Sequence, residues 1–258
     1  MIDEVIKIVL EASKIMLCDD KFSVEEKDGA TNIVTSNDVK VQEFLIDKLK
    51  QLLPESSFYC EENNIKDLSK DYIWIIDPID GTTNYAHHIP ITAISVALEY
   101  KGEIILGVVF NPYQNTLYQA EKNKGALLNG KPIHVTNHPF NKSVLYTAFS
   151  AYDKTKSPKI FDFLKTIFPE VNDIRRTGSA AFEISSIGAG RGDLFFELKL
   201  STWDYAAASI IIQEAGGYIS NLEGKIPLDG PSLIVAANTK ENHLKLINLI
   251  KDIYCQSL

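Results

Sequence analysis

The decisive stretch of this sequence is Trp74-Ile75-Ile76-Asp77-Pro78-Ile79-Asp80-Gly81-Thr82-Thr83-Asn84-Tyr85. Its apolar, aromatic and β-branched beginning, from Tyr72 to Ile76, predicts a buried strand with Asp77 at its end. Pro78 lacks a backbone donor and is expected to turn the chain, so that Asp80 points toward the same place. Two carboxylates at this spacing suit a hard cation, because magnesium prefers oxygen ligands.

The residues that follow suit a phosphate. Gly81 lets the backbone bend sharply and approach a ligand closely. A helix that begins at Thr82 has free amides in its first turn, and these favour a bound phosphate at the same place. A bare D-x-x-D-G string is equally typical of a strand, a turn and an Asp-capped helix with no ligand. The longer string, with Trp74 and Asn84 included, favours the ligand site.

Two distant segments add acids at predicted element boundaries. Glu61-Glu62 follows the apolar Phe58-Tyr59, and Asp204 lies in Trp203-Asp204-Tyr205-Ala206-Ala207-Ala208. A paired glutamate in a loop is by itself typical of a solvated surface. Asp204 by itself is typical of an acid in a first helical turn, which the helix dipole favours. Together with the decisive stretch, the two segments offer four carboxylates to one site.

The rest of the chain predicts layered α and β structure. Apolar periodicity predicts helices near residues 5–16, 160–167, 180–187, 202–215 and 241–254, and another that follows Ser36-Asn37 and is ended by Pro54. Strands are predicted near 91–100, 104–110, 174 and 194–197. Lys101-Gly102 and Asn129-Gly130 are expected hairpin turns, and Lys27-Asp28-Gly29-Ala30-Thr31-Asn32 a polar loop. The segment from Asn141 to Ser157 is polar and predicted to be irregular. It divides an N-terminal α+β half (1–140), which carries the metal and phosphate motif, from a C-terminal α/β half (141–258).

Charge and cysteine content narrow the class of protein. The formal net charge of -8 over 258 residues is poorly suited to holding a nucleic-acid backbone. Three cysteines indicate a reducing compartment without a disulfide framework. Asp3, Glu4, Lys7 and Glu11 interrupt the first apolar stretch, so no export signal is expected, nor any membrane span. These features predict a cytoplasmic protein without direct nucleic-acid or membrane partners.

The sequence resembles the inositol monophosphatase family of magnesium-dependent, lithium-sensitive phosphatases. The family pattern is an acidic pair, the string W-x-x-D-P-x-D-G-T-x-N, then W-D-x-A-A and an A-G-G stop. Here they read Glu61-Glu62, Trp74 to Asn84, Trp203-Asp204 and Ala215-Gly216-Gly217, in matching order from about Lys27 to Ala237. The resemblance implies an α-β-α-β-α layered sandwich of the sugar phosphatase type, an α+β fold, as a homodimer. It also implies hydrolysis of a small phosphorylated polyol or sugar, first of all inositol monophosphate, by in-line attack of a metal-activated water.

The resemblance also assigns residues. It implies Glu61, Asp77 and the carbonyl of Ile79 as ligands of one Mg²⁺, and Asp77, Asp80 and Asp204 as ligands of a second, with a weaker third ion near Glu61. Asp38 matches the acid that pairs with Thr82 to orient the attacking water, although a helix cap is an alternative or additional role. The implied catalytic residues are Asp38, Glu61 and Thr82. The implied substrate-binding residues are Asp80, Gly81, Thr82, Gly178, Ser179, Ala180, Glu197 and Asp204.

Several alternatives stay open. Cys60, where the family often has glycine, is either an oxidation-sensitive thiol or a packing residue, and Asn32 replaces a common acid. Glu197 is alternatively a surface acid, and Arg175, Arg176 and Arg191 bind either a second phosphate or ordinary ion-pair partners. Alternative substrates are fructose 1,6-bisphosphate, histidinol phosphate and nucleotide 3'- or 2'-phosphates. A regulatory partner of transcription machinery is the alternative of another class. His87-His88 is expected at a rim, and His134, His138 and His243 show no recognisable partner.

Overall fold

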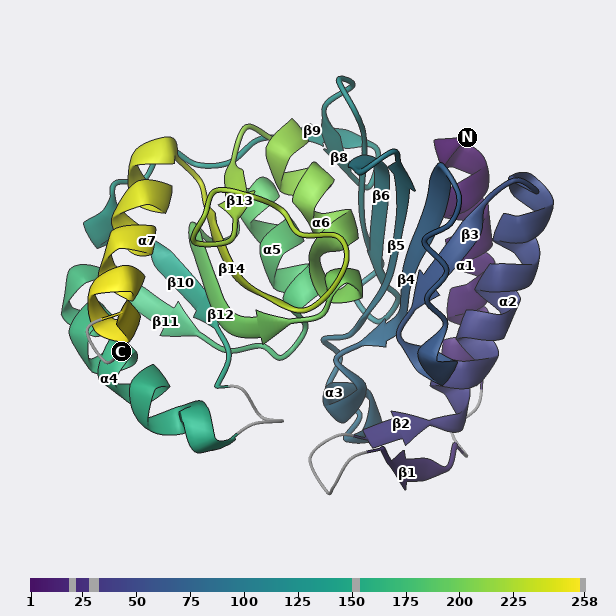
Figure 1. The fold of residues 1–258 in the computed structure, drawn as a ribbon, viewed down its shortest axis with the longest axis horizontal. Helices are drawn as coiled ribbons and strands as arrows, with labels where there is room; N and C mark the ends of the chain where they lie inside the picture. Colours follow the sequence, from purple (N-terminus) through teal and green to yellow (C-terminus); the bar gives the residue numbers. More distant parts are fainter. Residues whose placement is uncertain (19–21, 28–32, 150–153, 256–258) are drawn as a thin grey trace.

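Two sheets alternate with three layers of helices in the computed structural model, which describes residues 1–18, 22–27, 33–149 and 154–255 (Figure 1). The first sheet has seven strands in chain order: β3 (Ser57–Cys60), β4 (Tyr72–Asp80), β5 (Ala93–Tyr100), β6 (Glu103–Asn111), β7 (Thr116–Glu121), β8 (Ala126–Leu128) and β9 (Lys131–Ile133). Only its β3–β4 pair is parallel among these neighbours.

The second sheet has five strands, in the order β11 (Asp173–Arg175), β10 (Val144–Thr147), β12 (Leu194–Leu200), β14 (Ser232–Ala237) and β13 (Tyr218–Ser220). β10 runs parallel to β11 and β12, whereas β14 runs antiparallel to both of its neighbours. β1 (Val24–Glu26) and β2 (Ile33–Thr35) form a separate, antiparallel two-stranded ribbon.

The helices form the other three layers (Figure 1). The outer face of the first sheet packs against α1 (Ile2–Cys18) and α2 (Ser36–Leu52). Both sheets pack against α5 (Ala180–Gly188) and α6 (Thr202–Glu214), which lie between them. The outer face of the second sheet packs against α4 (Ser157–Ile167) and α7 (Lys240–Cys255). The predicted α-β-α-β-α sandwich is therefore confirmed. Short helical turns are α3 (Thr82–Ala86), η1 (Glu62–Asn64), η2 (Phe140–Lys142), η3 (Lys154–Lys156) and η4 (Phe168–Glu170).

The apolar pattern explains the layers. Trp74 and Ile76 of β4 pack toward α1 and α2, whereas Ile73 and Ile75 pack toward α5 and α6. A strand that is covered on both faces has a continuous apolar run, as this one does. Helix α6 is apolar around most of its circumference because it contacts a sheet on each side.

The six predicted helices are confirmed, and so are both hairpin turns. Lys101 and Gly102 have φ values of 52° and 86°, and Asn129 and Gly130 have values of 49° and 76°, as turns of this kind require. None of the helices within the described ranges is long and apolar enough to cross a membrane.

Two predictions about the positions of strands were wrong. Strand β4 does not end at Asp77 but continues to Asp80, and its register with β5 shifts between these residues. Pro78 is tolerated there because it lies beyond the last residue of β4 that pairs with β3, which is Ile76. The segment 141–157 is not irregular throughout, because β10 (Val144–Thr147) lies between two other strands of the second sheet; four residues are too few to show a period. Asp28–Asn32 of the predicted polar loop, including Asn32, lie outside the described residues.

The division into halves at residue 140 stays a prediction. Helix α6 belongs to the C-terminal half in sequence but packs on β4, β5 and β6 of the first sheet through residues such as Ala207 and Ile211. The two halves therefore share the layer between the sheets.

Candidate active site

Four carboxylates from three separate segments come together at the end of β4. β3 and β4 are parallel, with Cys60 opposite Ile76, so the next residues along each strand, Glu61 and Asp77, lie side by side. The shifted end of β4 carries Asp80. Helix α6 carries Asp204 in its first turn, where its carboxylate accepts a hydrogen bond from the Ser201 amide at 2.7 Å.

These acids repel one another in a buried place. Burial raises the pKa of Asp77 well above its usual range, and the negative charges of Glu61, Asp80 and Asp204 raise it further. Burial and the charges of Glu61 and Asp80 likewise raise the pKa of Asp204. Burial raises the pKa of Asp80 to about 6, against the opposing effect of hydrogen bonds from Ser179 and the Ala180 and Ala181 amides. A bound cation relieves exactly this kind of repulsion.

The donor set fits magnesium, since every side chain in it offers hard oxygen. In the described part of the chain, no three Asp, Glu, His or Cys side chains already converge at metal-binding distance. The carboxylate oxygens of the predicted acids accept hydrogen bonds instead. The Ile79 amide donates to Asp77 Oδ1 at 3.0 Å, and Ser179 Oγ donates to Asp80 Oδ2 at 2.6 Å. The structure thus gathers the predicted acids without forming a closed ligand shell.

Lys27 is a neighbour of the acids that the sequence did not reveal. Its ammonium lies 3.1 Å from Glu61 Oε1 and 2.5 Å from Glu62 Oε1. Burial lowers the pKa of Lys27, but Glu61 and Glu62 raise it overall. Glu62 is buried, and its backbone is held by two hydrogen bonds with the Gln42 amide, each 2.9 Å long. A solvated surface pair at Glu61-Glu62 is therefore excluded.

Asp38 and Thr82 meet as the resemblance implied. Thr82 Oγ1 lies 3.2 Å from Asp38 Oδ1 and 3.1 Å from the Ile79 carbonyl oxygen. The other oxygen of Asp38 accepts hydrogen bonds from the amide (2.9 Å) and the hydroxyl of Thr35, which caps α2. Burial raises the pKa of Asp38 to about 7, although the hydrogen bonds from Thr35 oppose the shift. Asp38 therefore serves the helix cap and the pairing with Thr82 together.

Two glycine turns lie face to face beside Asp80. Gly81 and Gly178 have φ values of +88° and +90°, and a Cβ on Gly81 would lie 2.9 Å from the Gly178 carbonyl oxygen. Asn84 Nδ2 donates to the Thr177 and Ile91 carbonyls, at 2.7 Å each. The predicted substrate residues Gly81, Thr82, Gly178, Ser179 and Ala180 are therefore brought together at the ends of β4 and α5.

Glu197 lies on β12 near these turns. No described residue donates a hydrogen bond to its carboxylate. Burial raises its pKa to about 8; Glu183 and Asp80 add to the shift, and Arg176 opposes it. Glu197 is half-buried, so it is neither a fully exposed surface acid nor a fully desolvated one.

Glu183 is a second residue that the sequence did not reveal. It lies in the apolar run of α5, where a single acid normally indicates an exposed helix position, yet its exposed fraction is 2%. Burial raises its pKa to about 7, against hydrogen bonds from Thr177 and Gly178. Its burial and its hydrogen bonds with Thr177 and Gly178, six and five residues back along the chain, are seen only in the folded structure.

A family model described as the inositol monophosphatase family matches residues 1–254. The chain belongs to the inositol monophosphatase family. Among its relatives, a putative Nus factor SuhB of Neisseria meningitidis serogroup B is 37% identical over 211 residues (81% of each chain), and an inositol-1-monophosphatase of Mesorhizobium japonicum is 34% identical over 212 residues (81% of this chain, 80% of the relative).

Solved structures agree with this family. The Bartonella henselae extragenic suppressor protein suhB has a TM-score of 0.89 at 30% identity, with 97% of this chain and 98% of that one covered. The Thermotoga maritima IMPase has a TM-score of 0.88 at 30% identity, with 99% and 98% covered. The fold of the family thus extends over nearly the whole chain.

The surroundings of Cys60 and of the arginines bear on the alternative roles that the sequence left open for them. Cys60 has an exposed fraction of 1%, and burial raises its pKa to about 12. Because the thiolate is the form that is oxidised, the packing role is favoured. Arg175 pairs with Asp173 at 2.5 Å, and Arg176 lies over the Phe149 ring at 5.2 Å.

The expectation that the later histidines lack partners was wrong for two of them. His138 Nδ1 lies 3.1 Å from Asp193 Oδ1, and His243 Nε2 lies 3.2 Å from Ser220 Oγ. Both partners are distant in sequence, which is why the pattern gave no sign of them.

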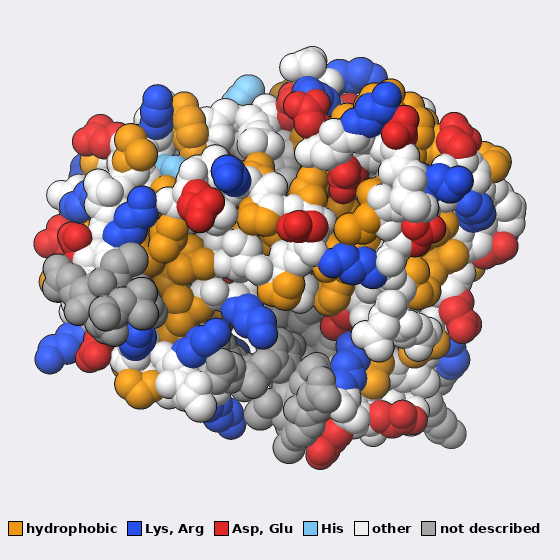
Figure 2. All heavy atoms as spheres, viewed as in Figure 1, with side chains coloured by type: hydrophobic (Ala, Val, Ile, Leu, Met, Phe, Trp, Pro, Cys, Tyr) orange, Lys and Arg blue, Asp and Glu red, His pale blue; other side chains and the backbone are white. Residues whose placement is uncertain are grey.

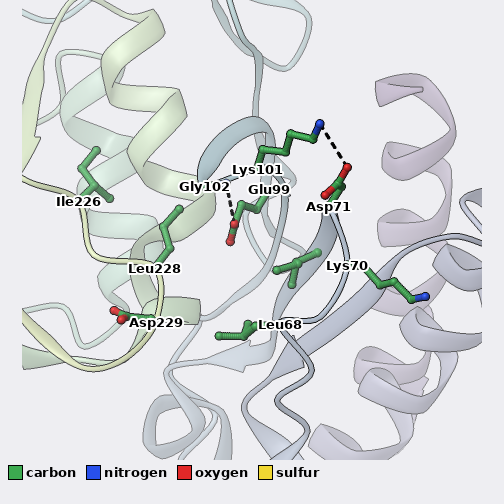
Figure 3. Close-up of a pocket in the computed structure, with 10 residues that line it drawn as sticks. Leu68, Lys70, Asp71, Glu99, Lys101, Gly102, Ile226, Leu228 and Asp229 are labelled. Atoms are coloured by element: carbon green, nitrogen blue, oxygen red, sulfur yellow. Dashed lines mark hydrogen bonds and ion pairs between the residues drawn. The ribbon is translucent and has the colours of Figure 1, made fainter.

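A hollow of about 460 Å³ lies at the start of β4, opposite the end that carries the acids (Figure 3). Its lining includes Leu68, Ile73 and Leu228, and Glu99 accepts a hydrogen bond there from the Gly102 amide at 3.0 Å. It shares no lining residue with the acidic cluster.

Figure 2 shows acidic and basic side chains interspersed over the face in view, rather than a continuous stripe of one charge.

Proposed function

We propose that this chain is a magnesium-dependent phosphatase that hydrolyses a small phosphate monoester, most readily inositol monophosphate, to the alcohol and phosphate. The observation that carries the proposal is the meeting of four mutually repelling carboxylates with the Asp38–Thr82 pair and the Gly81 turn. Uncatalysed hydrolysis of such esters is so slow that enzymes accelerate it by up to about 10²¹-fold. No single side chain supplies that, so a cation-binding cluster is the expected solution.

The residues divide into two ion sites in this proposal. Glu61, Asp77 and the Ile79 carbonyl would hold one ion, and Asp77, Asp80 and Asp204 the second, with a weaker third ion near Glu61. Magnesium, when bound, lowers the pKa of water and neutralises the phosphoryl oxygens and the leaving oxygen. Asp77 would be shared, because the charges of Glu61, Asp80 and Asp204 all act on it. Lys27 would balance the charge of Glu61 and Glu62 from the outer side.

Asp38 and Thr82 would orient the attacking water. The Thr82 hydroxyl has one proton, which Asp38 Oδ1 and the Ile79 carbonyl both attract, so a lone pair of its oxygen is left for the water. The amides of Gly81 and Thr82 would stabilise charge on the phosphoryl group. Because α3 has only five residues, these amides themselves, rather than a helix dipole, would contribute.

The polyol would lie against Gly178, Ser179, Ala180 and Glu197. A half-buried carboxylate to which no described residue donates a hydrogen bond, as at Glu197, favours a ligand that presents hydroxyl groups. The Mesorhizobium relative, an inositol-1-monophosphatase by name, supports this choice at 34% identity.

The test is a hydrolysis assay with the purified chain, with saturating magnesium and with excess chelator. The panel contains inositol monophosphate, fructose 1,6-bisphosphate, histidinol phosphate, nucleotide 3'- and 2'-phosphates and p-nitrophenyl phosphate. We expect hydrolysis only with magnesium, and the highest kcat/KM on inositol monophosphate. Full activity in chelator would reject the metal mechanism, and a higher kcat/KM on another ester would replace the substrate.

A regulatory function in transcription is the second candidate, because several relatives at 34–37% identity are named Nus factor SuhB. A pull-down from native extract tests it: specific capture of transcription proteins by both wild type and Asp77→Asn would support a role separate from hydrolysis. We further propose a cytoplasmic homodimer, which size-exclusion chromatography with light scattering and cell fractionation test. That the chain binds no nucleic acid directly stays a prediction.

A further inference from the structure

The turn Thr177–Gly178 is held from two opposite sides. Glu183 Oε1 accepts three hydrogen bonds from it: from the Thr177 amide at 2.6 Å, the Thr177 hydroxyl at 2.7 Å and the Gly178 amide at 3.1 Å. Asn84 Nδ2 donates to the Thr177 carbonyl from the other side. Every polar group of Thr177 therefore has a partner in one of these two side chains.

The held turn has little freedom to relax. A Cβ on Gly178 would lie 3.1 Å from Asn84 Nδ2, and the Gly178 carbonyl oxygen would lie 2.9 Å from a Cβ on Gly81. The backbones of the two glycine turns are thus in direct contact. A displacement of Thr177–Gly178 would change the shape of the space beside Gly81.

We infer that Glu183 is the positioning residue of the substrate-facing turn, holding Thr177 and Gly178 in place so that a polyol phosphate can bind beside Gly81. It acts through the backbone of the turn and does not itself touch substrate. This inference rests on the proposed function, because it takes the space beside Gly178 as the substrate site.

Hydrogen-bond acceptance, rather than charge, is what the geometry requires of Glu183. All three donors converge on one oxygen, and the oxygen of a carboxamide offers the same two lone pairs in the same place. Glutamine is therefore expected to replace Glu183, whereas methionine has a similar length but no comparable acceptor. Glu183 is nearly fully buried, and a methionine in its place would leave the Thr177 and Gly178 amides that point to it without their acceptor.

The experiment compares the full-length wild type with Glu183→Gln and Glu183→Met. Ser186→Ala is the matched control, because Ser186 is also a buried polar residue of α5 but contacts Tyr118 instead, at 3.1 Å. Hydrogen–deuterium exchange of the peptide that spans 175–180 reports on the turn, and kcat and KM for inositol monophosphate at saturating magnesium report on binding.

We expect about tenfold faster exchange of the turn amides in Glu183→Met. We also expect about a tenfold rise in KM with kcat within about threefold, the signature of lost substrate binding. Glu183→Gln and Ser186→Ala are expected to stay within about threefold of wild type in all three quantities. Unchanged exchange in Glu183→Met, or faster exchange with unchanged KM, would overturn the inference, as would Glu183→Gln behaving like Glu183→Met.

If Glu183→Met does not fold, Thr177→Val carries the test, since it removes one of the three donors. A smaller rise in KM of the same kind is expected, and a wild-type KM would count against Glu183. A wild-type chain that hydrolyses no monoester would reject the proposed function instead. Exchange would then still decide whether Glu183 holds the turn.

Discussion

Asp77 and Asp193 are both buried aspartates, with exposed fractions of 1% and 3%, but their surroundings are opposite. Asp193 accepts hydrogen bonds from the Val144 amide at 2.9 Å and the Thr136 hydroxyl, and its Oδ1 lies 3.1 Å from His138 Nδ1. Asp77 accepts one from the Ile79 amide and otherwise faces Glu61, Asp80 and Asp204.

The difference separates an acid whose charge is compensated by hydrogen-bond donors from one whose neighbours are other acids. The donors around Asp193 compensate its desolvation, and they join the segment after β9 to β10 and β12. The acids around Asp77 add to its desolvation penalty instead. Buried like charges cost stability, and under the proposed function the binding of a cation compensates this cost.

The largest expected effect on catalysis is at Asp77, the aspartate that is surrounded by other acids. Asp77→Asn is expected to lower kcat/KM by more than about 100-fold, because even groups outside the first ligand shell of a metal contribute about 10–100-fold. In chelator, the free energy of unfolding is expected to stay the same or to rise, since a repelling charge is removed. Asp204→Asn should behave alike. Steady-state kinetics and denaturant unfolding measure the two quantities, and wild-type activity in both variants would reject the two-ion arrangement.

The same substitution at Asp193 is expected to lower stability and to leave activity unchanged. Asp193→Asn replaces an acceptor oxygen by an NH₂ group that faces donors, so we expect a loss of about 1–3 kcal/mol in the free energy of unfolding. At a temperature where the variant stays folded, kcat/KM is expected to match wild type. Equal signs of the stability change at Asp77 and Asp193 would remove the distinction between the two environments.

Asp38 shares features of both classes, because it is bound by Thr35 and also faces Thr82. Asp38→Asn and Thr82→Ala are each expected to lower kcat by about 10–100-fold, with little change in KM. The double variant should be little worse than either, because groups that act as one unit are strongly non-additive. Losses that multiply would show that Asp38 and Thr82 act separately.

Glu197 is a half-buried acid whose carboxylate accepts no hydrogen bond from any residue that the structure describes. Glu197→Gln keeps its shape but weakens its acceptance of hydroxyl protons. We expect kcat/KM for inositol monophosphate to fall about tenfold, with a much smaller loss for p-nitrophenyl phosphate and unchanged magnesium affinity. The ratio of the two losses at saturating magnesium is the measurement. Equal losses would assign Glu197 to the common chemistry or to the fold.

These contrasts also mark what the sequence could and could not predict. The helices follow from local periodicity, the hairpin turns from their turn residues, and the acids of the site from short contiguous strings. Each of these signals lies within a single segment of the chain. Lys27 and the His138–Asp193 contact depend on segments that only the tertiary fold brings together, such as positions 27 and 61. Glu183 was missed for another reason: its partners are close in sequence, but a lone acid in α5 gives no sign that it is buried. A charge pattern along the chain does not distinguish a satisfied acid such as Asp193 from a repelled one such as Asp77.

His243 offers the smallest and most local test of the comparison. It is a satisfied buried base, with an exposed fraction of 7% and Nε2 3.3 Å from the Val235 carbonyl oxygen. Burial lowers its pKa below 6.5, although the contact with Val235 opposes the shift. The folded state therefore binds fewer protons than the unfolded state once the pH falls below 6.5.

Its contribution to stability should accordingly be complete above pH 6.5, and be lost as the pH falls from 6.5 toward the lower pKa of the folded state. His243→Gln keeps a polar partner for Ser220 and cannot titrate, so its free energy of unfolding should fall less than that of wild type between pH 7.5 and 5.5. Denaturant unfolding at the two pH values measures the difference in slope, with kcat unchanged because His243 lies on α7, outside the acidic cluster. Parallel losses in both proteins would show that His243 is not desolvated enough to respond to pH.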